Sequence, residues 1–157
     1  MGLRNILQGT EPTLRKNSRV VTEFNPRLHK LLDDMRETML AANGLGLAAP
    51  QVGVLRRVFV ADAGDGLIEF INPAIIEWWG EQVGNEGCLS VPERQEEVVR
   101  PMYVTVEAVG RDGKPFTLKA SGLMARCVCH EIDHLDGVLY TDYEGGNAVP
   151  SSGEKAR

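Results

Sequence analysis

The sequence predicts an α+β fold in which mostly antiparallel β-sheets pack around a central helix that carries an H-E-x-x-H motif. Three observations support this class: an amphipathic helical pattern early in the chain, a middle region of short strand-like runs, and a second helical pattern near the end. This order of helix, several strands and helix is typical of proteins whose α and β elements are segregated.

The first helix is predicted within the stretch "FNPRLHKLLDDMRETMLAANG". Asn25 can cap it, Pro26 suits the first helical position, and Gly44 can end it in a left-handed turn. Its apolar stripe consists of Leu28, Leu31, Leu32, Met35 and Met39.

The middle of the chain contains the β-strand patterns. Residues 56–62, 67–72 and 75–79 are short runs rich in β-branched and aromatic side chains. Residues 102–110 and 115–120 flank the turn sequence "RDGK", which predicts a hairpin. The stretch "SGLMARCVCHEIDHLDG" then predicts the second helix, with Ser121 as its cap and Gly137 as its stop.

Length and composition indicate one ordinary globular domain. The chain has 157 residues, of which 43% are hydrophobic and 25% are charged. We expect a single catalytic domain over residues 1–143, followed by a short flexible tail over 144–157 that is polar and contains Gly, Ser and Pro.

The charge argues against a dedicated nucleic-acid binder. The net charge is -5, and the longest basic runs are "LRK" and "LRR", so any contact with RNA would be local. No signal peptide and no apolar stretch of membrane-spanning length are present, which predicts a cytoplasmic protein without a membrane partner. Three cysteines in a reducing compartment are expected to be free thiols or metal ligands.

The second helix carries the motif with the most specific chemistry. His130 and His134 are four residues apart, so their side chains point within about 40° of each other, one turn apart. Two imidazoles in this arrangement can bind one metal ion. Glu131 projects beside them, close enough to reach a metal-bound water without being a ligand.

Known H-E-x-x-H families suggest tests for the third ligand. A metzincin would place a histidine where this chain has Tyr140. A thermolysin-like site needs a downstream glutamate on another helix, but only Glu144 and Glu154 follow, in or beside the polar tail. Both of these assignments fail.

A cysteine is the strongest remaining candidate for the third ligand. Cys127 precedes His134 by seven residues, a rise of about 10.5 Å, so it is expected to line a pocket or the core. Cys129 points to the opposite helix face and is expected in the core. Cys88, in "GNEGCLSVP", is favoured, and two histidines with one cysteine leave a position open for catalysis, with Zn(II) and Fe(II) both suitable.

A glycine-rich stretch, "NGLGLAAPQVG", follows the first helix. It lacks the third glycine and the preceding strand of a dinucleotide loop, so no dinucleotide cofactor is expected. Gly44 and Gly46 can let bare backbone approach an extended peptide. Gln51 can donate its amide to an oxyanion.

Together, "GLGLAAPQ", "EGCLS" and "HEIDH" resemble the three signature motifs of the peptide deformylase family, in the same order and at similar spacings, over about residues 4–143. The resemblance implies one divalent metal ion, typically Fe(II) in the cell, with Zn, Ni or Co also compatible. It assigns the metal to Cys88, His130 and His134. It assigns the catalytic roles to Glu131, Gln51 and Leu89, and the glycine of the second motif to Gly87.

The function implied is hydrolysis of the N-formyl group from the initiator methionine of nascent N-formylmethionyl polypeptides, releasing formate. A metal-bound water would attack the formyl carbonyl, with Glu131 as general base and then general acid. Gln51 and the backbone N–H of Leu89 would stabilise the oxyanion. The peptide would pair with Gly44, Leu45 and Gly46. The methionine pocket is assigned to Leu45, Leu123 and Cys127.

The chain departs from the family pattern twice. Cys129 stands where the family usually has Gln, so a local packing change is expected. Many bacterial members also carry a longer C-terminal helix implicated in ribosome docking, so a ribosome contact is expected to be transient and weakened here.

Two alternative functions remain. One is an H-E-x-x-H peptidase, whose expected third ligand is missing here. The other is a deformylase-like binding protein without turnover, which would normally have lost Glu131 or Cys88.

Overall fold

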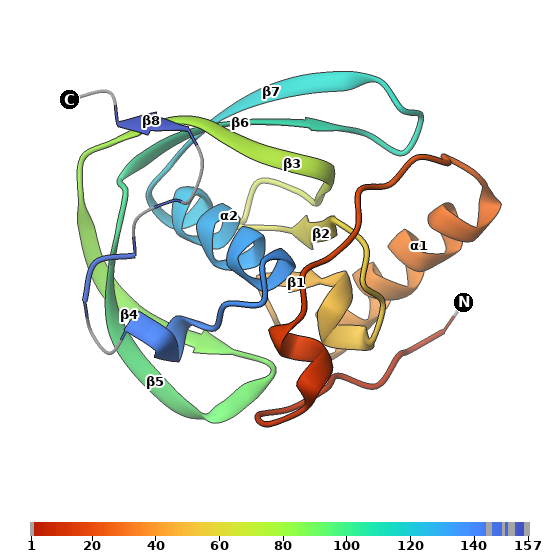
Figure 1. Ribbon diagram of the computed structural model, residues 1–157, viewed down its shortest axis with the longest axis horizontal. Helices are drawn as coiled ribbons and strands as arrows, with labels where there is room; N and C mark the ends of the chain where they lie inside the picture. The colour runs from red at the N-terminus through yellow and green to blue at the C-terminus, as the bar shows by residue number, and fades with distance from the viewer. Residues whose placement is uncertain (1, 144–145, 149, 151–152, 156–157) are drawn as a thin grey trace.

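The computed structural model describes residues 2–143, 146–148, 150 and 153–155 (Figure 1). Its main sheet has the strand order β1-β2-β3-β6-β7, in which neighbouring strands are antiparallel, and β8 joins β3 in parallel. The strands are β1 (Gly46–Ala48), β2 (Val58–Ala61), β3 (Ile68–Trp79), β6 (Tyr103–Val109), β7 (Pro115–Ser121) and β8 (Glu154–Lys155).

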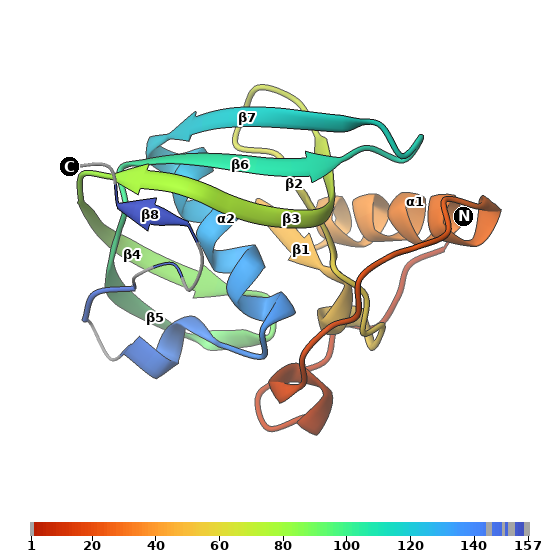
Figure 2. The ribbon, with the colours of Figure 1, turned by 45° about the horizontal axis from the view of Figure 1, so that its top comes forward.

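A central helix lies between this sheet and a separate hairpin. Figures 1 and 2 show α2 (Gly122–Leu135) running between the main sheet and the pair formed by β4 (Gln82–Cys88) and β5 (Val91–Arg100). The apolar side chains of α2 share one core cluster with Phe59 and Phe70 from the sheet. The predicted α+β fold with mostly antiparallel sheets around the motif-bearing helix is therefore confirmed.

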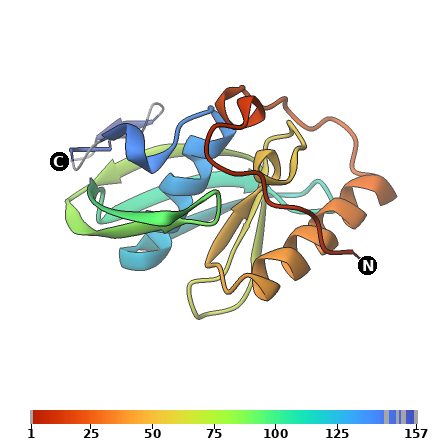
Figure 3. The ribbon, with the colours of Figure 1, turned by 90° about the horizontal axis from the view of Figure 1, so that it is seen from below.

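The first helix, α1 (Pro26–Ala41), covers the other face of the sheet (Figure 3). Its buried leucines and methionines form a second core cluster with Val58 and Val60, while Phe59 between them belongs to the α2 cluster. Strand β2 is buried along its whole length because it is covered on both faces.

The ends of α1 test the predicted caps. The Asn25 side chain accepts a hydrogen bond from Leu28 N, as its position before Pro26 predicts. The prediction that Gly44 supplies the left-handed turn is wrong: Asn43 has φ +57°, and Gly44 N donates to Met39 O at 3.0 Å. Asparagine tolerates this conformation better than most residues, so a glycine is not needed there.

Several β predictions needed correction. The two runs at 67–72 and 75–79 form the single strand β3, whose register shifts between Ile71 and Ala74, where Asn72 has φ +51°. The predicted β6–β7 hairpin is present. The β4–β5 hairpin was not predicted, because most of its residues are exposed or half-buried and show no clean apolar alternation.

The predicted ends of α2 are partly correct. Ser121 occupies the cap position but its side chain makes no capping hydrogen bond. Gly137 follows the last turn with φ +76°, and a Cβ there would lie 2.5 Å from Arg15 O. A glycine is required at this stop both by its backbone conformation and by the close approach of another segment.

Short elements complete the fold. The described residues include three 3₁₀ helices: η1 (Pro12–Arg15), η2 (Ala49–Val52) and η3 (Tyr140–Tyr143). In the predicted flexible tail, residues 144–145, 149, 151–152 and 156–157 lie outside the described part, while Asn147 bridges to Val99 and β8 pairs with β3. Flexibility of this tail stays a prediction. In the part of the chain that the structure describes, no helix is long and apolar enough to span a membrane.

Candidate metal centre and active site

Three potential metal ligands meet between the hairpin and the central helix. Cys88 is the last residue of β4, and His130 and His134 project from α2. Cys88 Sγ lies 3.3 Å from His134 Nε2, which lies 3.2 Å from His130 Nε2. All three ligand atoms lie within 4.8 Å of one another, so this group could hold a metal ion.

The donor chemistry of the group fits a divalent transition metal. One thiol and two imidazoles are ligands that Zn(II) and Fe(II) accept. His130 Nδ1 lies 2.8 Å from Glu86 Oε1, which favours the proton on Nδ1 and leaves the Nε2 lone pair facing the group. Although burial lowers the pKa of His130, the neighbouring Cys88 and Glu86 raise it to about 10. These neighbours therefore stabilise positive charge at this ring, whether a proton or a bound metal ion carries it.

Glu86 is the centre of a buried ion-pair network. Arg100 donates two hydrogen bonds to its carboxylate, at 2.7 and 2.8 Å, and Arg126 donates a third at 2.5 Å. Burial raises the pKa of Glu86, but the hydrogen bonds from Arg100 and His130 outweigh that effect and hold the pKa well below its usual range. Glu86 is therefore an anion that orients His130.

The network extends to the far side of Arg100. Arg100 Nη1 donates to Asp133 Oδ2 at 2.8 Å, and Tyr143 donates its hydroxyl proton to the same oxygen at 2.8 Å. The Arg100 guanidinium also lies 5.2 Å from the centre of the Tyr143 ring. Helix α2, strand β5 and the 3₁₀ helix η3 are thus connected through one buried arginine.

Glu131 lies beside the ligand group and against strand β1. Its side chain is buried, and Oε1 has no hydrogen-bond partner among the described residues. Burial raises the pKa of Glu131 to about 7. A Cβ at Gly46 would lie 2.6 Å from Glu131 Oε2, so the glycine makes room for this carboxyl.

Gln51 is oriented from both ends of its side-chain amide. Its Oε1 accepts a hydrogen bond from Ala48 N at 2.9 Å, and its Nε2 donates to Ser90 Oγ at 3.1 Å. Gln51 Nε2 also lies 3.6 Å from Cys88 Sγ, and Ser90 N lies 3.4 Å from the same sulfur. Two N–H donors therefore face the sulfur of Cys88.

A cleft of about 470 Å³ opens over this site. The structure brings the predicted substrate residues to its walls, together with Gln51, Leu89, Cys88, His130 and Glu131. The predicted substrate residues are Gly44, Leu45, Gly46, Gly87, Leu123 and Cys127, and all of them line the cleft. His134 is almost fully buried beneath it.

Comparison with known proteins identifies the family. The family model described as Polypeptide deformylase matches residues 3–147. The chain belongs to the polypeptide deformylase family. A peptide deformylase of Acetivibrio thermocellus is 56% identical over 142 residues, which cover 90% of this chain and 84% of that protein. One of Agathobacter rectalis is 53% identical, with 90% of each chain covered.

Solved deformylase structures share the fold. The crystal structure of peptide deformylase from Thermotoga maritima has a TM-score of 0.89 and 40% identity, and the match covers 90% of this chain and 97% of that one. The peptide deformylase from Synechococcus elongatus, solved in complex with actinonin, has a TM-score of 0.86 and 37% identity, with 88% and 77% covered. Membership of this family makes the chain an enzyme, a hydrolase.

The cysteines of this deformylase-family chain occupy different environments. Cys127 lines the cleft, and burial raises its pKa to about 12. Cys129 lies in the core cluster between α2 and the sheet, and burial raises its pKa to about 12 as well. Both positions agree with the helical geometry that separates these thiols from His134.

The residues that support the ligands carry little signal in the sequence. Glu86, Arg100 and Arg126 are remote from one another in sequence, and only tertiary contact pairs them. One local signal was available: Glu86 stands two residues before Cys88 on the same strand, where alternate side chains share a face.

Proposed function

We propose that this protein removes the N-formyl group from the initiator methionine of newly made polypeptides and releases formate. The observation that carries the proposal is the meeting of Cys88, His130 and His134 beside the buried Glu131 at the base of a cleft. Proteins of this family act on nascent polypeptides. The formylated methionine is the finer assignment proposed here.

The proposed cofactor is one divalent metal ion, Fe(II) first, with Zn, Ni or Co also compatible with the same ligands. Cys88, His130 and His134 would hold it. When bound, such an ion supplies Lewis-acid chemistry, acidifying a water molecule and polarising a carbonyl group. Glu86 would keep the His130 ring in the orientation and tautomer that binding needs.

Glu131 is proposed as the group that moves the proton. Its buried carboxyl lies beside the ligands, with Oε1 unpartnered among the described residues, so it can accept a proton from water. It would then return the proton to the amine nitrogen as the amide bond breaks. This assigns both the base step and the acid step to one side chain.

Gln51 and Leu89 are proposed to stabilise the oxyanion of the tetrahedral intermediate. The Gln51 amide is held by Ala48 and Ser90, so its Nε2 is directed toward Cys88 before substrate arrives. The backbone N–H of Leu89, next to the ligand Cys88, would be the second donor. Donors held in place before the reaction stabilise a developing charge without reorganising.

The peptide is proposed to lie along Gly44, Leu45 and Gly46. Strand β1 is at the edge of the main sheet and pairs only with β2 among the described strands, so its other side can pair with an extended chain. Leu45 and Leu123 line the cleft although about half of each side chain is exposed, at 47% and 48%. Together with Cys127 they would surround the methionine side chain, and Gly87 would border the same cleft.

The proposed partners are nascent N-formylmethionyl polypeptides in the cytoplasm, with at most a transient ribosome contact. A single catalytic domain over residues 1–143 contains every residue of the proposed site. No dinucleotide cofactor has a role in this reaction.

The test is formate release from a formyl-Met peptide, using protein loaded with Fe(II) or Ni(II) in the absence of oxygen. Formate appearing in proportion to active protein is the expected result. Metal-replete protein that releases none would overturn the proposal. Cleavage of an unformylated peptide at an internal bond would instead indicate a peptidase.

A further inference from the structure

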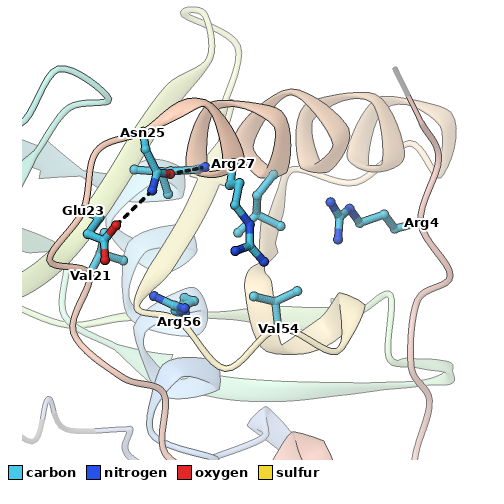
Figure 4. Close-up of a pocket in the computed structure, with 9 residues that line it drawn as sticks. Arg4, Val21, Glu23, Asn25, Arg27, Val54 and Arg56 are labelled. Atoms are coloured by element: carbon cyan, nitrogen blue, oxygen red, sulfur yellow. Dashed lines mark hydrogen bonds between the residues drawn. The ribbon is translucent and has the colours of Figure 1, made fainter.

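A second cleft, of about 260 Å³, lies between the N-terminal segment, the first turns of α1 and the loop that precedes β2 (Figure 4). It shares no lining residue with the cleft at Cys88, His130 and Glu131. We call it the arginine cleft because Arg4, Arg27 and Arg56 line it. Its apolar lining consists of Val21, Leu28, Leu31 and Val54.

Three arginines from different segments line the same cleft. In Figure 4 the Arg27 side chain reaches from α1 into the region between Arg4 and Arg56. Arg4 is anchored by Asp34, which accepts from Nε at 3.0 Å and contacts Nη2 at 2.9 Å. The one carboxylate lining the cleft is Glu23, whose Oε2 accepts a hydrogen bond from Asn25 at 3.3 Å.

Arg27 and Arg56 differ from most arginines of the molecule. Arg15, Arg57, Arg94, Arg100, Arg111 and Arg126 each form an ion pair with a carboxylate. Within the described residues, neither Arg27 nor Arg56 forms one, although the chain has an excess of acidic side chains. Arg19 adds a further positive charge nearby, because its backbone bridges to Arg56.

The position of Arg27 is unfavourable for the isolated protein. It stands in the first turn of α1, a turn that contains no acidic residue. The amino end of a helix carries partial positive charge, so a cation there is repelled and an anion is attracted. No contact among the described residues offsets this repulsion. A residue placed unfavourably in this way is typical of a site where a bound ligand, here an anion, supplies the missing contact.

The charge distribution along the chain agrees with this arrangement. Residues 1–57 contain nine Lys and Arg against five Asp and Glu, whereas residues 58–157 contain eight against seventeen. The arginine cleft is built entirely from the first of these segments. An acidic protein thus has an excess of basic residues in the segment that forms this cleft, and the local RNA contact that the sequence leaves open would be placed here.

We propose that the arginine cleft binds a phosphate ester of about nucleotide size, as a free nucleotide or as a unit of an RNA chain. Phosphate oxygens accept hydrogen bonds from several guanidinium groups at once. The phosphate would contact Arg27 and Arg56, with Arg4 held ready by Asp34. The sugar and base would lie on the apolar lining that includes Val21 and Val54.

The experiment measures binding of uridine monophosphate, inorganic phosphate and a short single-stranded RNA to metal-loaded protein by calorimetry at two salt concentrations. Arg27→Gln and Arg56→Gln should each weaken binding of the nucleotide by about tenfold, the loss expected for one hydrogen bond to a charged group. The matched control is Arg36→Gln, another exposed arginine of α1 with no ion pair among the described residues, which lines neither cleft. It should bind as the wild type does.

The results distinguish a free nucleotide from an RNA chain as the ligand, and they show whether the cleft binds either. Tight binding of the mononucleotide supports a free ligand, and much tighter binding of RNA with a steeper salt dependence supports the RNA chain. Equal binding of inorganic phosphate and nucleotide overturns the assigned apolar contact. No binding of any probe, or equal losses in all three variants, overturns the site. Formate release should be unchanged in every variant, which keeps this test independent of the proposed function.

Discussion

Beside the metal ligands, Arg100 and Arg126 are buried and form ion pairs with Glu86, whereas Arg27 and Arg56 of the arginine cleft are exposed and have no carboxylate partner among the described residues. A buried guanidinium must be paired because desolvation of an isolated charge is very unfavourable. An exposed one can stay unpaired because water solvates it. The first pair of arginines therefore fixes the orientation of a ligand histidine, and the second pair is free to meet an external anion.

The largest effect is expected at Glu131, the buried carboxyl in the cleft over the metal ligands, which forms no ion pair with an arginine among the described residues. Glu131→Gln should reduce kcat for formate release by about 10²- to 10⁴-fold, because the proton-transfer group is lost. Metal content measured by elemental analysis should stay at the wild-type level. Glu97→Gln, an exposed position on β5, is the control. Full activity of the Glu131 variant would refute its assignment.

The second-largest effect is expected at Glu86, the anion at the centre of the buried ion-pair network. Glu86→Ala removes the shared partner of Arg100, Arg126 and His130, and should lower the free energy of unfolding by about 3–5 kcal/mol. Arg126 then stays buried without its carboxylate, and Arg100 keeps only Asp133. Metal affinity should fall by about 10- to 100-fold because His130 loses its orienting contact. Denaturant unfolding and metal titration measure the two quantities.

Glu97→Ala provides the comparison for that variant and should change stability by no more than about 0.5 kcal/mol. Equal stability of the Glu86 and Glu97 variants would show that burial of the network has no energetic consequence.

A paired substitution compares the two kinds of arginine directly. Arg126→Met should destabilise the protein by about 1–3 kcal/mol, because the Glu86 carboxylate loses one of its buried donors. Arg27→Met should leave stability unchanged or raise it by about 0.3–1 kcal/mol, since a cation leaves the positive end of α1. Thermal and urea unfolding at low salt measure both. Similar losses of stability in the two variants would contradict the distinction between a buried, paired arginine and an exposed, unpaired one.

The smallest effect concerns Asp34, which anchors Arg4 at the arginine cleft. Burial raises the pKa of this carboxyl, but hydrogen bonds from Arg4 and Lys30 outweigh it and lower the pKa below its usual value. Asp34→Asn should therefore reduce stability by about 1–2 kcal/mol at pH 7. Because the folded-state pKa is lowered, the contribution is present above the unfolded-state pKa and is lost as the pH falls through the folded-state pKa.

Stability curves of the wild type and the Asp34 variant should converge in acid. Asp33→Asn, an exposed neighbour whose ion pair with Arg111 is at the surface, should show little difference at any pH. A difference in the free energy of unfolding between wild type and the Asp34 variant that persists in strong acid would contradict the proposed link between Asp34 protonation and stability.

Elements with strong local signals were predictable. The capped apolar stripe of α1, the turn between β6 and β7 and the left-handed backbone of Gly137 after α2 are all indicated by residues close in sequence. The β4–β5 hairpin was missed because its buried positions include the charged residues Glu86 and Arg100, which carry no apolar signal. Asn43 replaced Gly44 at the left-handed turn because two residue types tolerate that conformation.

The spacing of His130, Glu131 and His134 alone determined that two histidines can bind one metal ion with a carboxyl beside them, because residues one helical turn apart are neighbours in any α-helix. Helical rise also separated Cys127 from His134 and left Cys88 as the favoured third ligand. Only the tertiary structure brought Cys88 to the histidines, enclosed Glu86 between two arginines and left Arg27 and Arg56 unpaired. Burial decides whether a charge must be compensated, and burial is a property of the packed chain.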